Sequence, residues 1–478
     1  MKRNKKIGVL LGILLCVSLA AFSVSKYEQQ KEIIKNSDEI ILEVDGESVK
    51  ALSWECNTGD FAFHKDDSGS WLYDADEAFP VEEEKINELL NLFEEFGVSF
   101  RIEEVEDFAQ YGLEEPVCTI RMETETQTYE ILVGNYSEMD SERYVSIGDG
   151  NAYLVKEDPL DRYAVELSDL IRHDEIPAFE EVTQVQFSGA ESGKIVYEED
   201  SGNTYSAEDV YFVERGEERL ALDTTRVNDY LDTIKNLGLQ DYVTYNASDE
   251  ELATYGMDEP ELSIQLDYAM TEEGSDEKTT GTFTLQIGRD PKEREMEEAE
   301  KEEAEKEEAE EVTAYARAGE SRILYQITAQ QYEKLMDMSY DTLRHQEMFW
   351  ADFADMYQLT VSLEGETHTI TSEMEGEERT WYYKEEELEM AGLRSAVRGL
   401  TAVSFTGEQP TQKEEISLTI YLDNENDPEV SIQLYRHDGD RCIAVVDGKA
   451  TAFVERAKVV DLIEAVQNIV LEEQESES

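Results

Sequence analysis

Apolar side chains recur along this chain with two spacings, one typical of strands and one typical of helices. Short runs in which apolar and polar residues alternate, such as 117–122 and 262–268, predict β-strands. Residues 86–96 and 227–237 carry apolar side chains every three or four positions, which predicts helices with one buried face. The same order of strands and helix occurs in both regions, so the pattern predicts antiparallel meanders that each pack a helix.

A short motif occurs at the same place in both regions. Its shared positions are Tyr111, Gly112, Leu113 and Pro116 in the first copy and Tyr255, Gly256, Met257 and Pro260 in the second. Sequence similarity extends beyond the motif, which indicates an internal duplication, so fold and function have to be considered unit by unit.

The chemistry of the motif predicts the end of a helix and a turn. In the second copy, Ser248 and Glu251 have the spacing of a capping box at the start of a short helix. Glycine adopts the left-handed conformation that ends a helix at no steric cost, and the apolar residue after it should contact the residue five positions earlier. Proline then prevents the helix from resuming. We therefore interpret the motif as structural and not as a ligand site.

The fold class predicted is α+β: tandem repeated units of antiparallel β-meander with packed helices, preceded by an N-terminal transmembrane helix. The expected parts are a membrane segment at 1–25, a stalk at 26–37, two full units at 38–176 and 177–349, a diverged third unit at 350–472 and an acidic, disordered tail at 473–478. The third unit lacks the Tyr-Gly motif and is therefore shorter.

Two insertions interrupt the second unit, a polar loop around Thr271 to Lys278 and a longer charged segment. Residues 292–311 are almost entirely Glu, Lys and Ala, which are strong helix formers. They lack an apolar stripe that could pack against a core. We expect a protruding charged helix or a partly disordered loop, with a coiled-coil arm as the alternative.

The N-terminus has the sequence of a membrane anchor. Four basic residues among the first six precede an apolar run from Ile7 to Val24, which as a helix spans about 27 Å and is just long enough to cross a bilayer. The basic flank should remain in the cytoplasm, which places the chain from Lys26 onward outside. We expect a single-pass protein of the cell membrane with most of the chain extracytoplasmic. A cleaved signal peptide is the alternative.

The net charge narrows the choice of partners. The formal value of -72 argues against nucleic acid as a partner and against adsorption to an anionic membrane surface.

The four cysteines are spread over the chain. Cys16 lies in the apolar segment, Cys56 and Cys118 lie in the first unit, and Cys442 lies in the third. A Cys56–Cys118 disulfide is compatible with this distribution, but we expect buried free thiols.

The search for catalytic or metal-binding motifs returns no assignment. The five histidines do not have zinc-site spacing, and phosphate-loop, nucleophile-elbow and dinucleotide motifs are absent from the sequence. His173 and His345 both follow an arginine, which we interpret as two structural Arg-His pairs that bind carboxylates; a duplicated functional pair is the alternative. Residues 423–427 resemble a calcium loop but lack its glycine and its bidentate glutamate. We expect Trp71 and Trp381 to be core residues. No catalytic, cofactor or metal residue is predicted.

The combination of these features resembles a bacterial family, the domain of unknown function 4340 (DUF4340) family. The resemblance rests on the basic start with a single apolar segment, the Trp-x-Tyr strand at Trp71, the motif at 111–116 and the strand ending in Leu132-Val133-Gly134. It covers 38–350 clearly and the remainder weakly, and the insertion at 292–311 departs from it. The resemblance implies an extracytoplasmic companion of ABC-2-type transporters, without catalytic residues that could be carried over to this chain.

The expected function is therefore that of a membrane-anchored, extracytoplasmic and non-catalytic protein, a scaffold or accessory component of an ABC-type transport or envelope system. Its partners would be the membrane, through the N-terminal helix, and ABC transporter subunits. The alternative is a binding module for cell-wall glycan or a cationic ligand, which the aromatic and acidic content suggests. A hydrolase that uses scattered carboxylates is the weakest hypothesis, because acidic residues are so abundant here that any pair could be chosen.

Overall fold

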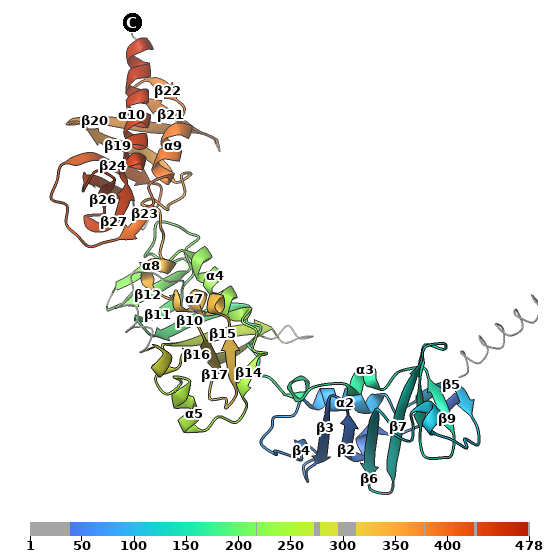
Figure 1. Cartoon of the computed structure of the whole chain (residues 1–478). Helices are drawn as coiled ribbons and strands as arrows, with labels where there is room; N and C mark the ends of the chain where they lie inside the picture. Colours follow the sequence, from blue (N-terminus) through green and yellow to red (C-terminus); the bar gives the residue numbers. More distant parts are fainter. Residues whose placement is uncertain are drawn as a thin grey trace, which may run out of the picture. The chain divides into compact units, whose positions relative to one another are not determined.

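The computed structural model describes residues 39–216, 218–271, 278–294, 312–376, 378–424 and 428–476. The chain folds as two compact parts, an N-terminal part (Met1–Asp174) and a C-terminal part (Glu175–Ser478). The N-terminal part contains one nine-stranded antiparallel sheet, and the C-terminal part contains two more (Figure 1). The fold is thus mostly β, in agreement with the predicted repeated β units.

The first sheet has the strand order β1-β5-β9-β8-β7-β6-β2-β3-β4. Its strands are β1 (Glu39–Leu42), β2 (Val49–Cys56), β3 (Gly59–Lys65), β4 (Trp71–Tyr73), β5 (Phe96–Ile102), β6 (Cys118–Thr124), β7 (Thr128–Ser137), β8 (Glu142–Ser146) and β9 (Ala152–Val155).

The second sheet has the order β13-β12-β11-β10-β15-β16-β17-β18-β14. Its strands are β10 (Glu181–Ser188), β11 (Ser192–Tyr197), β12 (Tyr211–Arg215), β13 (Glu218–Ala221), β14 (Tyr242–Thr244), β15 (Leu262–Thr271), β16 (Lys278–Gly288), β17 (Ala314–Ala318) and β18 (Leu324–Ile327).

The third sheet has the order β22-β21-β20-β19-β24-β25-β26-β27-β23. Its strands are β19 (Met356–Leu363), β20 (Glu366–Glu375), β21 (Glu378–Tyr383), β22 (Glu386–Leu388), β23 (Ala402–Phe405), β24 (Glu414–Leu422), β25 (Glu429–Arg436), β26 (Arg441–Val446) and β27 (Lys449–Glu455).

The three sheets share one connectivity over eight strands. In each, a meander of three strands in the first sheet and four in the others is followed by a helix and a strand on the far side of the sheet. That strand is at the edge in the second and third sheets, whereas β1 lies outside β5 in the first. The next strand returns to pair with the first strand of the meander, as β6 pairs with β2, β15 with β10 and β24 with β19. The last strand of the unit then pairs with the strand on the far side, as β9 pairs with β5. The third sheet keeps this order although its sequence lacks the Tyr-Gly motif.

One principal helix follows each meander. These helices are α2 (Glu83–Asn91), α4 (Thr224–Lys235) and α9 (Ala391–Arg398). Their buried residues are the apolar ones at helical spacing, for example Val227, Leu231 and Ile234 in α4. The remaining helices are η1 (Gly46–Ser48), η2 (Ala109–Tyr111), α3 (Leu160–Tyr163), η3 (Leu167–Leu170), α5 (Asp249–Thr254), α7 (Ala329–Met336), α8 (Tyr340–Leu343) and α10 (Arg456–Ser476).

Alternation along the strands builds each core. In β24, Ile416, Leu418 and Ile420 are at most 1% exposed, whereas the residues between them are half-buried. Helices α9 and α10 contact each other, and α10 also contacts β26 and β27, so the buried face of the third sheet is covered by both helices (Figure 1). Each sheet thus obtains a core from the period-two pattern of its own strands.

The structure corrects the expectation for two of the four cysteines. Cys56 and Cys118 form a disulfide between β2 and β6, where they face each other in register. Only pairing of these two strands brings the thiols together, and that pairing is not visible in the local sequence. Cys442 is free and buried, as expected.

Helix α10 continues to Ser476, so the expectation of a disordered tail after residue 472 is wrong for the part that is described. Glutamate and glutamine are good helix formers and extend the preceding turns. The predicted membrane segment, the stalk and residues 295–311 of the charged insertion lie outside the described residues. Within the described ranges, no helix has both the length and the apolar character needed to cross a membrane.

Candidate functional site

The two copies of the repeated motif adopt the same backbone geometry. Gly112 and Gly256 have φ of 71° and 73°, in the left-handed region. The amide of Leu113 donates to the carbonyl of Phe108 at 3.1 Å, and the amide of Met257 donates to that of Leu252 at 2.8 Å. Together with the bond from each glycine amide to the carbonyl three residues earlier, these are the hydrogen bonds of a Schellman closure.

A second glycine packs directly on each closure. A Cβ atom on Gly134 would lie 2.3 Å from the carbonyl oxygen of Tyr111, and one on Gly288 would lie 2.8 Å from that of Gly256. The tyrosine rings also have equivalent partners: Tyr111 contacts Tyr144 with ring centroids 4.9 Å apart, and the second copy has the same arrangement at 4.7 Å. The motif and a glycine of the next strand but one, Gly134 in β7 or Gly288 in β16, therefore form a single packing unit.

Other residues singled out in the sequence have separate positions. Trp71 and Trp381 are 4% and 3% exposed and belong to their cores. Of the two histidines that follow an arginine, His345 lines a cavity, and its ring makes contacts that are described next.

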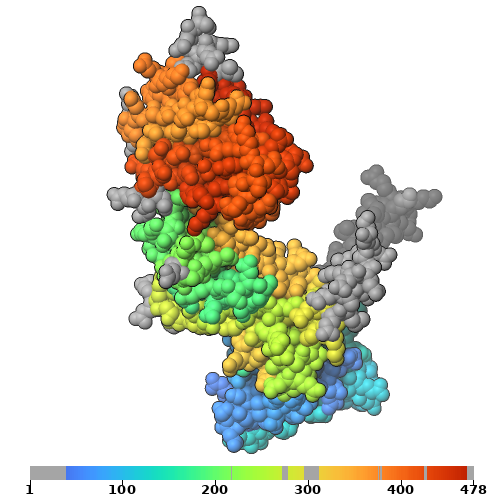
Figure 2. Space-filling view, turned by 90° about the vertical axis from the view of Figure 1, so that its left-hand side faces the viewer, coloured from blue at the N-terminus to red at the C-terminus, as the bar shows by residue number. Residues whose placement is uncertain are grey.

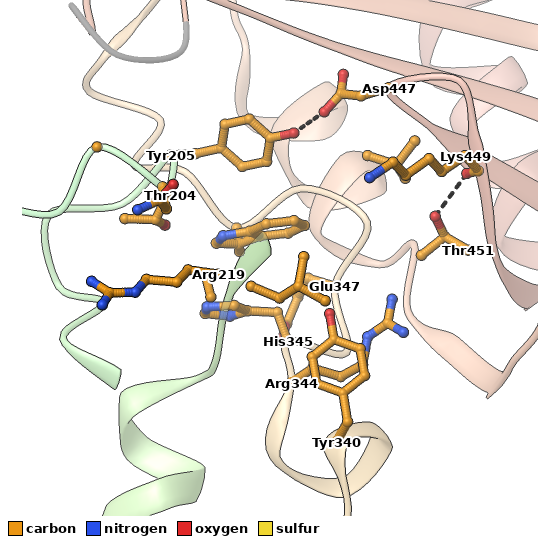
Figure 3. A pocket seen from close by; sticks show the side chains of 16 residues that line it. Thr204, Tyr205, Arg219, Tyr340, Arg344, His345, Glu347, Asp447, Lys449 and Thr451 are labelled. Carbon is orange, nitrogen blue, oxygen red and sulfur yellow. Dashed lines mark hydrogen bonds between the residues drawn. The ribbon is translucent and has the colours of Figure 1, made fainter. Parts of the chain in front are cut away.

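That cavity lies in the C-terminal part and has a volume of about 370 Å³. One wall comes from the second sheet and the connection to the third (202–205, 219–221 and 340–350), and the other comes from β26 and β27 (446–451) (Figure 3). In the space-filling view, the third-sheet region in orange and red adjoins second-sheet residues in green (Figure 2). The cavity thus lies where the two sheets of this part meet.

His345 is held by a buried carboxylate. Its Nε2 lies 2.9 Å from Oδ1 of Asp209, whose side chain is only 2% exposed. The other carboxylate oxygen of Asp209 accepts a hydrogen bond from Oγ1 of Thr204 at 2.5 Å. Both oxygens of this buried carboxylate are therefore used, and the imidazole ring has a fixed orientation.

Aromatic rings form the centre of the site. The indole of Trp350 stacks on His345 with ring centroids 5.0 Å apart and an angle of 8° between the planes. Tyr205 packs on the same indole at 4.7 Å. The hydroxyl of Tyr205 donates to the carboxylate of Asp447 on the opposite wall (Figure 3). The side-chain amide of Asn424 donates to the main-chain carbonyl of Tyr205 at 3.1 Å. Tyr205 therefore joins the second sheet to the third.

Three basic side chains line the cavity, and each already has acidic or aromatic partners. Arg219 donates to Glu198 at 2.6 Å and to Glu214 at 3.2 Å. The guanidinium of Arg344 lies over the ring of Phe405 at 3.8 Å, and Lys449 lies 3.7 Å from a carboxylate of β13. The positive charges of these side chains are thus paired mainly with groups of the protein itself.

Two acidic groups lie beside the histidine: Glu347, which lines the cavity, and Asp223, the N-cap residue of α4. Single ligand atoms of Asp223, His345 and Glu347 lie within 4.8 Å of one another. Within the described ranges, the Glu347 carboxylate makes no hydrogen bond or ion pair with another side chain. On the opposite wall, burial raises the pKa of the Asp447 carboxyl, although the Ser431 amide and Lys449 act in the other direction.

Sequence reasoning singled out only His345 in this site. Thr204, Asp209 and Asp223 lie in loops and caps without periodicity, and acidic residues are too common here for two of them to stand out. The sequence did carry one signal, an Asp at the N-cap position before the α4 stripe, but it indicates a helix start and not a site.

Comparison with known proteins agrees with the motifs. Residues 71–260 match the model of the family described as "Domain of unknown function (DUF4340)". This match covers less than half of the chain and confirms the resemblance drawn from the sequence over the residues that it spans. The matched segment contains both copies of the Tyr-Gly motif and runs from β4 to the end of the second motif. No curated protein and no solved structure gives a significant match.

Proposed function

We propose that this chain is a membrane-anchored, extracytoplasmic and non-catalytic protein that acts as a scaffold or accessory component of an ABC-type transport or envelope system. The observation that carries the proposal is the use of the repeated sequence. Its shared residues end helices and pack against glycines, and they recur in sheets of one connectivity. Repeated units of this kind supply extended surface for partners and are typical of scaffolds.

The location rests on two further observations. The basic and then apolar N-terminus is the sequence of an anchor that leaves the rest of the chain outside. The Cys56–Cys118 disulfide fits an oxidising compartment, because such bonds are rare in the cytosol. The transporter as partner follows from the family resemblance.

Two experiments test the proposal. The first treats intact cells with a protease that cannot cross the membrane and follows the loss of full-length protein. This loss should occur only if the chain lies outside the cell membrane. The second crosslinks cells and purifies the protein from native membranes through a C-terminal tag. We expect the permease or ATPase of an ABC system to copurify. The matched control replaces residues 1–25 with a cleavable secretion signal, which should release the protein and abolish copurification. Protection from the protease, or recovery of no transporter subunit, would contradict the proposal.

A second candidate function is the binding of a cell-wall glycan or a cationic ligand. The cavity favours it, because Tyr205, Tyr340, Trp350 and several polar groups line a space of about 370 Å³. Aromatic faces and convergent polar groups are the usual lining of small-molecule sites. Calorimetric titration of the full chain with wall polymers tests glycan binding. The variant for comparison is Trp350→Phe, which keeps an aromatic ring at this position. A titration without heat of binding would exclude the glycan as a ligand.

A further inference from the structure

We propose that Asp223, His345 and Glu347 bind a divalent transition-metal ion beside this cavity, which His345 and Glu347 line. The inference deepens the second candidate function by naming the cation, and it is independent of the transporter proposal. The three side chains come from the N-cap of α4 and from the segment that follows α8, and they offer one imidazole nitrogen and two carboxylate oxygens. Figure 3 shows His345 and Glu347 side by side.

The hydrogen bond that His345 donates to Asp209 prepares the ring as a ligand. A carboxylate is an acceptor only, so the ring nitrogen beside Asp209 carries the proton. The other nitrogen, Nδ1, lies 4.0 Å from Oδ2 of Asp223 and faces the proposed site. Metal-binding histidines almost always donate their second nitrogen to a carboxylate or carbonyl in this way, which fixes the tautomer and the ring.

Charge around the site also favours a cation. The carboxylates of Asp223 and Glu347 converge beside a ring that is already paired with a third carboxylate. The guanidinium of Arg226 pairs with one of these carboxylates: its Nε lies 3.5 Å from Oδ2 of Asp223, and its side chain is 43% exposed. Among the described residues, the Glu347 carboxylate forms no ion pair. A divalent ion neutralises both at once.

The donor set indicates which cation. Calcium takes six to eight oxygen ligands, and magnesium keeps most of its water, whereas imidazole together with carboxylates suits zinc and its neighbours. Asp223 also caps α4 through Oδ1, so only Oδ2 is available to a metal. Three protein ligands beside an open cavity leave a coordination position for water or for an oxygen of a bound ligand.

The test uses the full chain, purified in detergent through a tag without histidines and stripped with EDTA. Isothermal titration calorimetry with zinc should show one equivalent bound, and calcium and magnesium should bind at least tenfold more weakly. Glu347→Gln and Asp223→Asn should each weaken zinc binding at least tenfold. Asparagine is as good an N-cap as aspartate, so Asp223→Asn keeps α4 intact and decides the matter if Glu347→Gln does not fold.

The matched control is His64→Gln. His64 forms an exposed pair with Asp74 at 2.6 Å in the N-terminal part of the chain, outside the proposed site. This variant should bind zinc like the wild type. Absence of stoichiometric zinc binding, equal binding by the two site variants, loss of binding in the control, or calcium binding as tight as zinc would each overturn the proposal. None of these results would affect protease accessibility or transporter copurification.

Discussion

Gly134 is the residue on which the first motif copy depends most closely. A methyl group there would meet the carbonyl oxygen of Tyr111 and the side chain of Leu113. Gly134→Ala should therefore lower the local free energy of unfolding by about 1–3 kcal/mol, the usual cost of overpacking. Hydrogen exchange of peptides covering β6 and β7 measures this loss.

Gly97 provides the matched control, because it is also a strand glycine of the first sheet but has room. Its added Cβ would lie 3.7 Å from Cδ of Lys156, an ordinary contact. Gly97→Ala should change the local free energy of unfolding, measured by hydrogen exchange, by less than about 0.5 kcal/mol, the range of an unconstrained substitution. If both variants exchange alike, the packing of Gly134 on the motif is not important for stability.

Cys442 allows a prediction about reactivity. The thiol is fully buried, and burial, with a contribution from the Glu415 charge, raises its pKa to about 12. Since the thiolate is the nucleophile, iodoacetamide at pH 8 should leave Cys442 unmodified in the folded protein and alkylate it in urea. Mass spectrometry of the peptide that contains Cys442 distinguishes this thiol from Cys16. Rapid alkylation of the folded protein would show that the third core opens readily.

At the scale of elements, the two motif copies end helices of different strength. Helix α5 has a full capping box between Ser248 and Glu251, whereas η2 begins without a side-chain cap. Ser248→Ala should cost about 1 kcal/mol, the usual value for loss of an N-cap. Thr254→Ala is the control, because that hydroxyl bonds only to the Glu250 carbonyl within the same helix. Urea unfolding followed by circular dichroism compares them, and an equal loss of stability in both variants would contradict the role of the cap.

Elements were more accessible to sequence reasoning than their pairing. Alternation located strands such as β15, and the cap residues located α5, because both signals are local. The return of β6 to pair with β2 depends on contacts between residues far apart in the chain. The Cys56–Cys118 bond is a consequence of that pairing, which is why counting cysteines led to the wrong expectation.

The cavity was less predictable for a related reason. His345 was noticed because it follows Arg344 in the sequence. Asp209 and Asp223, which contact its ring, lie 136 and 122 residues earlier in the chain. In a chain with 113 acidic residues, no local feature distinguishes these two. Only the fold of the second sheet brings them to the same ring.

At the scale of the whole molecule, the contact between the second and third sheets depends on a few polar groups in a chain of net charge -72. Asp447 is the most informative of them, because it accepts hydrogen bonds from the Tyr205 hydroxyl and from the amide of Ser431. Burial raises its pKa above the ordinary value of 3.8. The folded state therefore binds the proton more tightly than the unfolded state does.

The sign of the pH effect follows from this shift. Asp447 contributes stability that is fully present below pH 3.8 and is lost as the pH rises through the raised pKa of the folded state. Asp447→Asn removes the titration, and asparagine tolerates the left-handed φ of 49° at this position. We expect the free energy of unfolding of the wild type minus that of Asp447→Asn to fall through this window and then to level off. Taking the difference removes the contribution of the other carboxylates, which both proteins share.

Lys449 provides the check on the cause, because its charge lowers the pKa of Asp447. Lys449→Gln should move the fall in stability to higher pH, whereas a purely structural role of Asp447 would leave its position unchanged. Urea unfolding between pH 3.5 and 7, followed by tryptophan fluorescence, measures all three proteins, since Trp350 contacts Tyr205 at this junction. Parallel curves for the wild type and Asp447→Asn would mean that the carboxyl at this junction titrates alike in the folded and unfolded chain. The charge of the Asp447 carboxyl would then contribute nothing to the stability of the contact between the third sheet and the second.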